Sequence, residues 1–232
     1  MSAPSLSDAE ERAIVEAALE RLPIFPLPSS VLIPGGHLPL HIFEPRYRAM
    51  VAACLATNRV LAVGLLEPGW EEDYHGRPPV APIVGAGLIQ SDEKLADGRY
   101  NILVHGVHRI RIVEELQSQE PYRLVRAQLV TDLPRPGGLL VEAGSRTLRQ
   151  LVVDLAGALP DNAGGPLAEV CVRERDPGRL ADVVGAAVLV DHRQRQEFLE
   201  ETDVGRRLDL VSETVAQVLL QVSSGAGGGY VM

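Results

Sequence analysis

The sequence predicts an α+β fold in which a β-rich part precedes a helical part. Short apolar runs separated by proline, glycine and charged residues recur between residues 22 and 134, which is the pattern of strands and turns. After residues 134–138 the apolar residues instead recur every three or four positions, the period of amphipathic helices. The chain has 232 residues, of which 46% are hydrophobic and 23% charged, so it is long enough to bury a sizeable core.

The N-terminal segment 1–21 is expected to hold one amphipathic helix, from about residue 7. Ser7 and Glu10 have the spacing of a capping box, which marks a helix N-terminus. The apolar residues that follow share one helical face: Ile14, Val15, Ala18 and Leu19. The segment lacks the basic and then apolar pattern of a signal peptide, and no apolar run in the chain reaches the roughly 18 residues of a membrane span. We therefore expect a cytoplasmic protein that does not enter the membrane.

Residues 22–134 are expected to form a β-rich domain with one inserted helix. Five prolines between residues 23 and 39 cannot donate to a strand ladder, so the first strands should be short, bulged or at a sheet edge. The pair Glu44-Pro45 favours a change from strand to helix, and a helix over 45–57 would align Tyr47, Met50 and Cys54. Further strands are expected at residues 60–66, 83–90, 100–105, 108–114 and 122–130.

Residues 138–222 are expected to form a helical subdomain, followed by a flexible tail at 223–232. Two apolar stripes indicate its first helices: Leu140, Leu148, Leu151, Val152, Leu155 and Leu159, and then Leu180, Val183, Val184, Ala187 and Val188. Residues 204–222 carry an a/d seam of three heptads. Such a short seam more often packs inside its own bundle, and the alternative is a dimer formed through 204–222.

The charge and the metal-binding residue types exclude several classes of function. The net charge of −9 is spread over both halves of the chain, so no basic surface is predicted and nucleic acid is an unlikely partner. Cys54 and Cys171 are the only cysteines and form no zinc motif. His37 and His41 would lie roughly 13 Å apart on one strand, and His105 and His108 would face opposite sides. We therefore expect no metal site.

Catalytic motifs are also missing from the sequence. No Gly-Lys pair exists, so there is no phosphate-binding G-x-x-x-x-G-K-[ST] loop, and there is no G-x-S-x-G nucleophile elbow. Gly85-x-Gly87 lacks the third glycine of a dinucleotide site. The acidic residues at 71–73 and 200–201 read as solvated surface. We expect neither catalytic residues nor a cofactor.

An ordered series of motifs resembles a known family. It includes the segment His41-Ile42-Phe43-Glu44-Pro45-Arg46-Tyr47-Arg48, the glycine-spaced segment 83–89, the segment 102–110, Leu180-Ala181-Asp182, and the segment 195–208. Together these resemble the N-terminal, substrate-recognition domain of the Lon protease family in a stand-alone form, and are also similar to the Lon-like domain of cereblon. The resemblance implies a PUA-like β pseudo-barrel followed by a helical bundle. It also implies a non-catalytic module that binds protein or unfolded polypeptide, as an adaptor or holdase in protein quality control; the alternative is a nucleic-acid-binding PUA-like protein.

Two groups of residues are candidates for specific roles. Glu44, Pro45, Arg46 and Tyr47 are expected to organise the junction between barrel and helix, with Glu44 at the positive end of the helix dipole. Peptide binding is expected at the edge strands and at residues 67–82, which contain the only tryptophan. Trp70 could equally fold back over the core. The candidate peptide-binding residues are Trp70, Tyr74, Phe25, Ile33 and Leu38.

Overall fold

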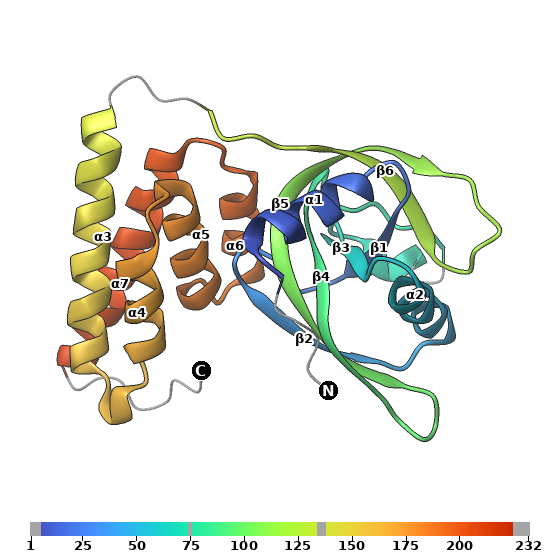
Figure 1. The fold of residues 1–232 in the computed structure, drawn as a ribbon, viewed down its shortest axis with the longest axis horizontal. Helices are drawn as coiled ribbons and strands as arrows, with labels where there is room; N and C mark the ends of the chain where they lie inside the picture. Colours follow the sequence, from blue (N-terminus) through green and yellow to red (C-terminus); the bar gives the residue numbers. More distant parts are fainter. Residues whose placement is uncertain (1–5, 74–75, 134–137, 225–232) are drawn as a thin grey trace. The chain divides into compact units, whose positions relative to one another are not determined.

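The computed structural model describes residues 6–73, 76–133 and 138–224. It divides into two compact units, Met1–Thr131, called here the barrel unit, and Asp132–Met232, called the helical unit. The barrel unit is built on a mixed sheet and the helical unit on helices alone among the described residues (Figure 1). The predicted α+β fold class is confirmed.

The barrel unit is built on six strands in the order β2-β5-β4-β3-β1-β6. A further pairing of β5 with β6 closes the five strands β5, β4, β3, β1 and β6 into a barrel and leaves β2 outside it. The bounds are β1 Leu22–Leu27, β2 His37–Ile42, β3 Val60–Leu65, β4 Ile83–Lys94, β5 Tyr100–Leu116 and β6 Arg123–Leu129.

Among the strands that the structure describes, only β2 is left at an edge of this sheet. It pairs with β5 alone, antiparallel, from His37 opposite His105 to Ile42 opposite Tyr100. β1 was expected to be short, bulged or at an edge because of its prolines, and it is short, with six residues. It is not an edge strand, since it is parallel to β3 on one side and antiparallel to β6 on the other, with Pro23 and Pro26 at paired positions.

β5 is one long strand where the sequence predicted two. Its register with β4 shifts between Ala86–His108 and Gly87–Gly106, so that Val107 forms a β-bulge. The extra residue changes the alternation of side chains along the strand. His105 and His108 therefore both face helix α1, contacting Glu11 and Glu16 respectively, and the prediction that they face opposite sides was wrong.

The glycines of β4 and β5 let the segment before β2 cross the strands closely. A Cβ on Gly85 would lie 1.9 Å from the carbonyl oxygen of Leu32, and one on Gly106 would lie 2.3 Å from that of Ile33. Gly106 also exchanges backbone hydrogen bonds of 2.8 Å with Gly35 and Gly36. Only glycine leaves room for such an approach.

Two helices complete the barrel unit. α1 (Asp8–Ala17) begins with the capping box predicted at Ser7 and Glu10, and lies against β4 and β5 (Figure 1). α2 (Pro45–Ala56) buries the predicted stripe of Tyr47, Met50 and Cys54, together with Val51. The two faces of the sheet bury separate clusters: that of α1 includes Val15, Ile24, Val84 and Ile110, and that of α2 includes Phe25, Leu61, Ile102 and Leu124.

The helical unit holds α3 (Gly138–Ala158), α4 (Gly165–Arg173), α5 (Pro177–Val188), α6 (His192–Glu200) and α7 (Val204–Ser223). The seam of α7 buries Leu208, Val211 and Val215, and α7 packs against α3 and α5 of the same chain. The centre of the seam is thus occupied within the bundle. Leu140 and Ala187 were expected in buried stripes but are exposed; Leu140 lies in the first turn of α3 and Ala187 in the last turn of α5.

A buried arginine fixes the start of the helical unit. No sequence pattern predicts this role. Arg207 is fully buried, with its Nη2 atom 2.7 Å from Asp132 Oδ2 and its Nε atom 3.7 Å from Asp182 Oδ1. Next to it, Leu133 N donates to the carbonyl of Thr202. Residues 132 and 133 are therefore attached to α5 and to the start of α7.

Candidate functional site

The junction between β2 and α2 is built around Tyr47. Glu44 is the N-cap residue of α2 and Pro45 its first residue, as the Glu44-Pro45 pair predicts. Arg46 Nε lies 3.1 Å from Glu44 Oε2, and the Arg46 guanidinium lies 4.6 Å from the centroid of the Tyr47 ring. The ring of Tyr47 is buried against Phe25, with centroids 4.3 Å apart. These contacts support a structural role for the four junction residues.

The five candidate peptide-binding residues occupy different environments. Phe25 is 6% exposed and Ile33 is 0% exposed, so both belong to the core, and their assignment to a peptide-binding surface is corrected. Both residues lie in apolar runs that resemble an edge strand in sequence. In the structure, residues 31–36 cross closely over β4 and β5, and this crossing buries Ile33. Leu38 on β2 and Trp70 are half-buried. Tyr74 lies outside the described residues.

The open edge at β2 carries a polar network on its exposed face. His41 Nδ1 lies 2.7 Å from Asn101 Oδ1, and Asn101 Nδ2 donates to Glu93 Oε2 at 2.9 Å. Arg99 Nη1 lies 3.2 Å from His41 Nε2 and Arg99 Nε donates to Asp97. Asn101 Oδ1 can accept a hydrogen bond from His41 Nδ1, and Arg99 can donate one to His41 Nε2. Each polar group is thereby partnered, so the network holds β2, β4 and β5 together and leaves none of these groups poised for reaction.

Beyond this network the edge ends in an exposed aromatic residue. Phe43 follows β2 directly and is 61% exposed, with its ring 6.3 Å from that of His41. Leu38 and Leu40 face the other way and pack at the margin of the α2 cluster. β2 therefore combines an unpaired strand edge with apolar side chains that are not fully covered.

Residues 67–82 are attached at another stretch of β5. Arg77 Nη1 lies 2.8 Å from Glu115 Oε1, and Arg123 bonds both Glu115 and the carbonyl of Pro78. Trp70 begins the short 3-10 helix Trp70–Asp73 of this segment. β2 instead pairs with residues 100–105, so the structure does not bring the two candidate peptide-binding surfaces together.

Neither cysteine is prepared for nucleophilic chemistry. Burial raises the pKa of the Cys54 thiol to about 12 and that of the Cys171 thiol to about 11. Among the described residues no three His, Cys, Asp or Glu side chains converge as they would around a metal ion. No helix in the described part of the chain is long and apolar enough to cross a membrane.

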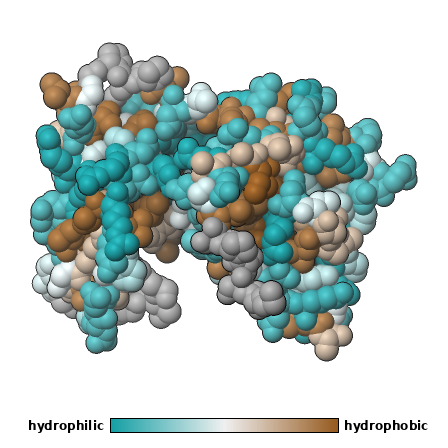
Figure 2. Space-filling view, in the orientation of Figure 1, coloured by the Kyte–Doolittle hydropathy of each residue, from teal (hydrophilic) through white to brown (hydrophobic). Residues whose placement is uncertain are grey.

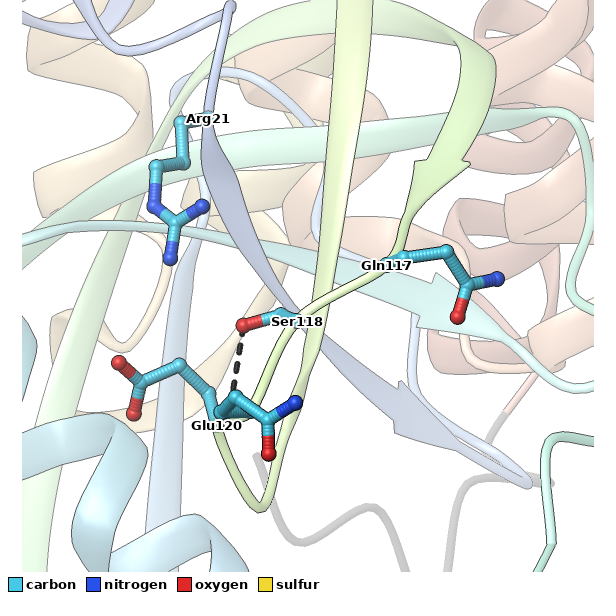
Figure 3. Close-up of a pocket in the computed structure, with 5 residues that line it drawn as sticks. Arg21, Gln117, Ser118 and Glu120 are labelled. Atoms are coloured by element: carbon cyan, nitrogen blue, oxygen red, sulfur yellow. Dashed lines mark hydrogen bonds between the residues drawn. The ribbon is translucent and has the colours of Figure 1, made fainter.

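A shallow polar hollow of about 450 Å³ lies beside the connection between β5 and β6 (Figure 3). It is lined by Arg21, Gln117, Ser118, Gln119 and Glu120. Ser118 Oγ accepts a hydrogen bond from the backbone N–H of Glu120, so this hydroxyl is engaged in a turn. The neighbouring Tyr122 has its pKa raised, first by burial and then by the charge of Glu120. A basic and an acidic side chain on an open rim give the hollow no clear ligand chemistry.

Exposed apolar side chains occur on both units. The visible face of each unit shows hydrophobic residues interspersed with hydrophilic ones (Figure 2). The barrel unit exposes Phe43, Val113 and Leu129, and the helical unit exposes Leu139, Leu140, Val170, Val172, Val190 and Leu220, among others. Apolar side chains scattered singly among polar ones are ordinary on a protein surface and do not by themselves mark an interface.

The fold agrees with the comparisons with known proteins. Residues 21–217 match the family model of the ATP-dependent protease La (LON) substrate-binding domain. The chain belongs to this family. Two solved structures share the fold: the N-terminal domain of the Mycobacterium avium complex Lon protease (TM-score 0.65, 20% identity, 84% of this chain and 98% of that one) and the Lon N-terminal domain protein from Xanthomonas campestris (TM-score 0.53, 23% identity, 82% and 96%).

Full Lon proteases match this substrate-binding domain over a limited part of their length. Lon protease 2 of Myxococcus xanthus is 32% identical over 83% of this chain but only 23% of its own. The Lon protease of Roseiflexus castenholzii is 34% identical over 82% of this chain and 23% of its own. The chain thus spans about a quarter of the length of these relatives.

Proposed function

We propose that this chain is a non-catalytic module that binds unfolded polypeptide, acting as an adaptor or holdase in cytoplasmic protein quality control. Membership in a substrate-binding family is the observation that carries this proposal. Two features of the chain are consistent with it. The sequence contains no Gly-Lys pair for a phosphate loop, and burial keeps both thiols protonated near neutral pH.

The free edge of β2 is the first proposed contact surface. An extended segment can add to an unpaired strand edge through backbone hydrogen bonds, which are independent of sequence and therefore suit a binder of many polypeptides. Pro39 lacks a backbone N–H, so the edge offers an interrupted row of donors. Leu38 on the strand and Phe43 just beyond it would supply apolar contacts to the added segment.

The segment 67–82 is the second proposed contact surface. Trp70 is half-buried, so part of its ring is available to a partner while the rest contacts the protein. Arg77 and Arg123 attach the segment to β5, which reduces the entropy lost when a partner binds. Trp is also enriched among residues that dominate binding energies.

Paired variants distinguish the two surfaces. The parent, Phe43→Ala and Trp70→Ala are titrated with a reduced, unfolded polypeptide, and binding is measured by anisotropy of a dye on that polypeptide. We expect at least a fivefold weaker Kd, about 1 kcal/mol, for one or both variants with unchanged thermal unfolding. Arg173→Ala, an exposed helical position in the other unit, serves as the control. Parent-like Kd values for both variants would exclude both surfaces.

Two further assays test the class of function. The purified protein should neither hydrolyse ATP nor cleave unfolded casein, and activity that persists through repurification would contradict the non-catalytic proposal. RNA binding is measured at low salt to test the nucleic-acid alternative. The net charge of −9 predicts that RNA binding is undetectable.

A further inference from the structure

Three histidines of β2 and β5 are linked to α1, two of them directly. His105 Nδ1 lies 2.9 Å from Glu11 Oε2, and His108 Nε2 lies 3.5 Å from Glu16 Oε1. Both carboxylates belong to α1, so His105 and His108 connect this helix to the sheet. His37 of β2, an exposed residue, stacks on His105 of β5 with ring centroids 4.9 Å apart.

The surroundings of His37 oppose a positive charge on its ring. The side chain of Glu11 faces His105 from α1, and Gln90, which is uncharged, bonds His37 from β4. A proton on His37 would place a positive charge against the stacked ring of His105, an interaction that lowers the pKa of His37 more than Glu11 raises it.

His108 is the second unfavourable position for a proton. Its Nε2 atom is buried and has no hydrogen-bond partner. On α1, Glu16 attracts a positive charge on the ring, whereas Arg12 repels it. Since the Glu16 side chain is 49% exposed, water screens its attraction for a positive charge on the His108 ring.

We propose that these histidines form an acid-sensitive clasp, in which protonation of His37 and His108 releases α1 and loosens the edge strand β2 while the rest of the barrel stays folded. The remaining apolar attachment within α1 rests on Val15, which is buried, and on Ile14, which is partly buried against the same cluster. The interior strand β3 is buried along its whole length and has no histidine, so it is independent of the clasp.

The direction of the pH effect follows from the folded-state pKa values. The pKa of His37 is lowered, first by burial and then by the charge of His105, and the pKa of His108 is lowered, first by burial and then by the charge of Arg12. A histidine whose pKa is lower in the folded than in the unfolded state stabilises the folded state at pH values above about 6.5, the pKa of histidine in the unfolded chain. That contribution is lost as the pH falls through the lower folded-state pKa values.

Backbone amide exchange of the full chain tests the clasp at pH 7.5 and pH 5.5, with exchange times scaled for the intrinsic rates. The protection of residues 8–17 and 37–42 should fall at least tenfold at pH 5.5, while the protection of residues 60–65 changes by less than twofold. A parallel change in all three segments would overturn the proposal.

Two variants identify the groups responsible. The double variant H37Q/H108Q carries neutral side chains at both pH values, so the selective loss of protection at pH 5.5 should disappear. His192→Gln, on α6 of the helical unit, should keep the parent's behaviour. If H37Q/H108Q folds and retains the parent's pH dependence, the clasp is refuted; if it does not fold, the comparison of segments in the parent protein still decides.

Discussion

Tyr47 offers the sharpest test of how the barrel is held to α2. Tyr47→Ala deletes a ring that is 7% exposed and lies 4.3 Å from the ring of Phe25. Truncating a large buried aromatic residue costs about 3–5 kcal/mol, because apolar surface is lost and a cavity remains. The ring pair contributes about 0.5–1.5 kcal/mol to this cost. We therefore expect a loss of about 3–5 kcal/mol in the unfolding free energy of the barrel unit.

Urea unfolding followed by Trp70 fluorescence measures this loss, because the only tryptophan lies in the barrel unit. Tyr47→Phe keeps the ring and should lose less than about 1.5 kcal/mol. Phe43→Ala, close by in the chain but 61% exposed, should change stability by less than about 0.5 kcal/mol. A Tyr47→Ala cost below about 1 kcal/mol, or one equal to that of Phe43→Ala, would refute the structural role of the junction.

Three further predictions concern single positions. Thermal unfolding should show that Gly85→Ala destabilises the barrel unit by several kcal/mol, since its Cβ would lie 1.9 Å from the Leu32 oxygen. Gly157→Ala, with open space around it in α3, should instead stabilise the protein by about 0.5–1 kcal/mol. Arg207→Ala should cost the helical unit about 3–5 kcal/mol in the same measurement, because it removes a fully buried guanidinium together with its ion pairs to Asp132 and Asp182, while the exposed Arg206→Ala should be nearly neutral. Neither cysteine should react with a thiol reagent at pH 8 until guanidinium unfolds the chain, because burial holds both pKa values well above 8.

The local elements could be predicted because their signals lie within a few residues. The capping box at Ser7, the strand-to-helix change at Pro45 and the period of α3 each depend on neighbours in the sequence. Sequence reasoning divided β5 into two strands because the bulge at Val107 depends on its pairing with β4. The same bulge moved His108 to the face of His105, which alternation alone could not reveal.

The surface assignments were less accurate because burial depends on what packs against a residue. Phe25 and Ile33 lie in apolar segments that read as edge strands, yet pairing of β1 on both sides and the crossing over Gly85 and Gly106 cover them. The ion pair between Asp132 and Arg207 joins residues 75 positions apart. Neither residue has a neighbour in sequence that signals this pairing.

The sequence by itself determined the family, the succession of a β-rich part and a helical part, and the acidic charge, because motif order, hydrophobic period and composition are properties of the chain alone. Only the tertiary structure decided that β2 is the single open edge among the described strands, and that His37 stacks on His105 beneath Glu11. These features arise from strand register and barrel closure, which are set by contacts between segments far apart in the chain. A one-residue bulge is enough to change which side chains meet.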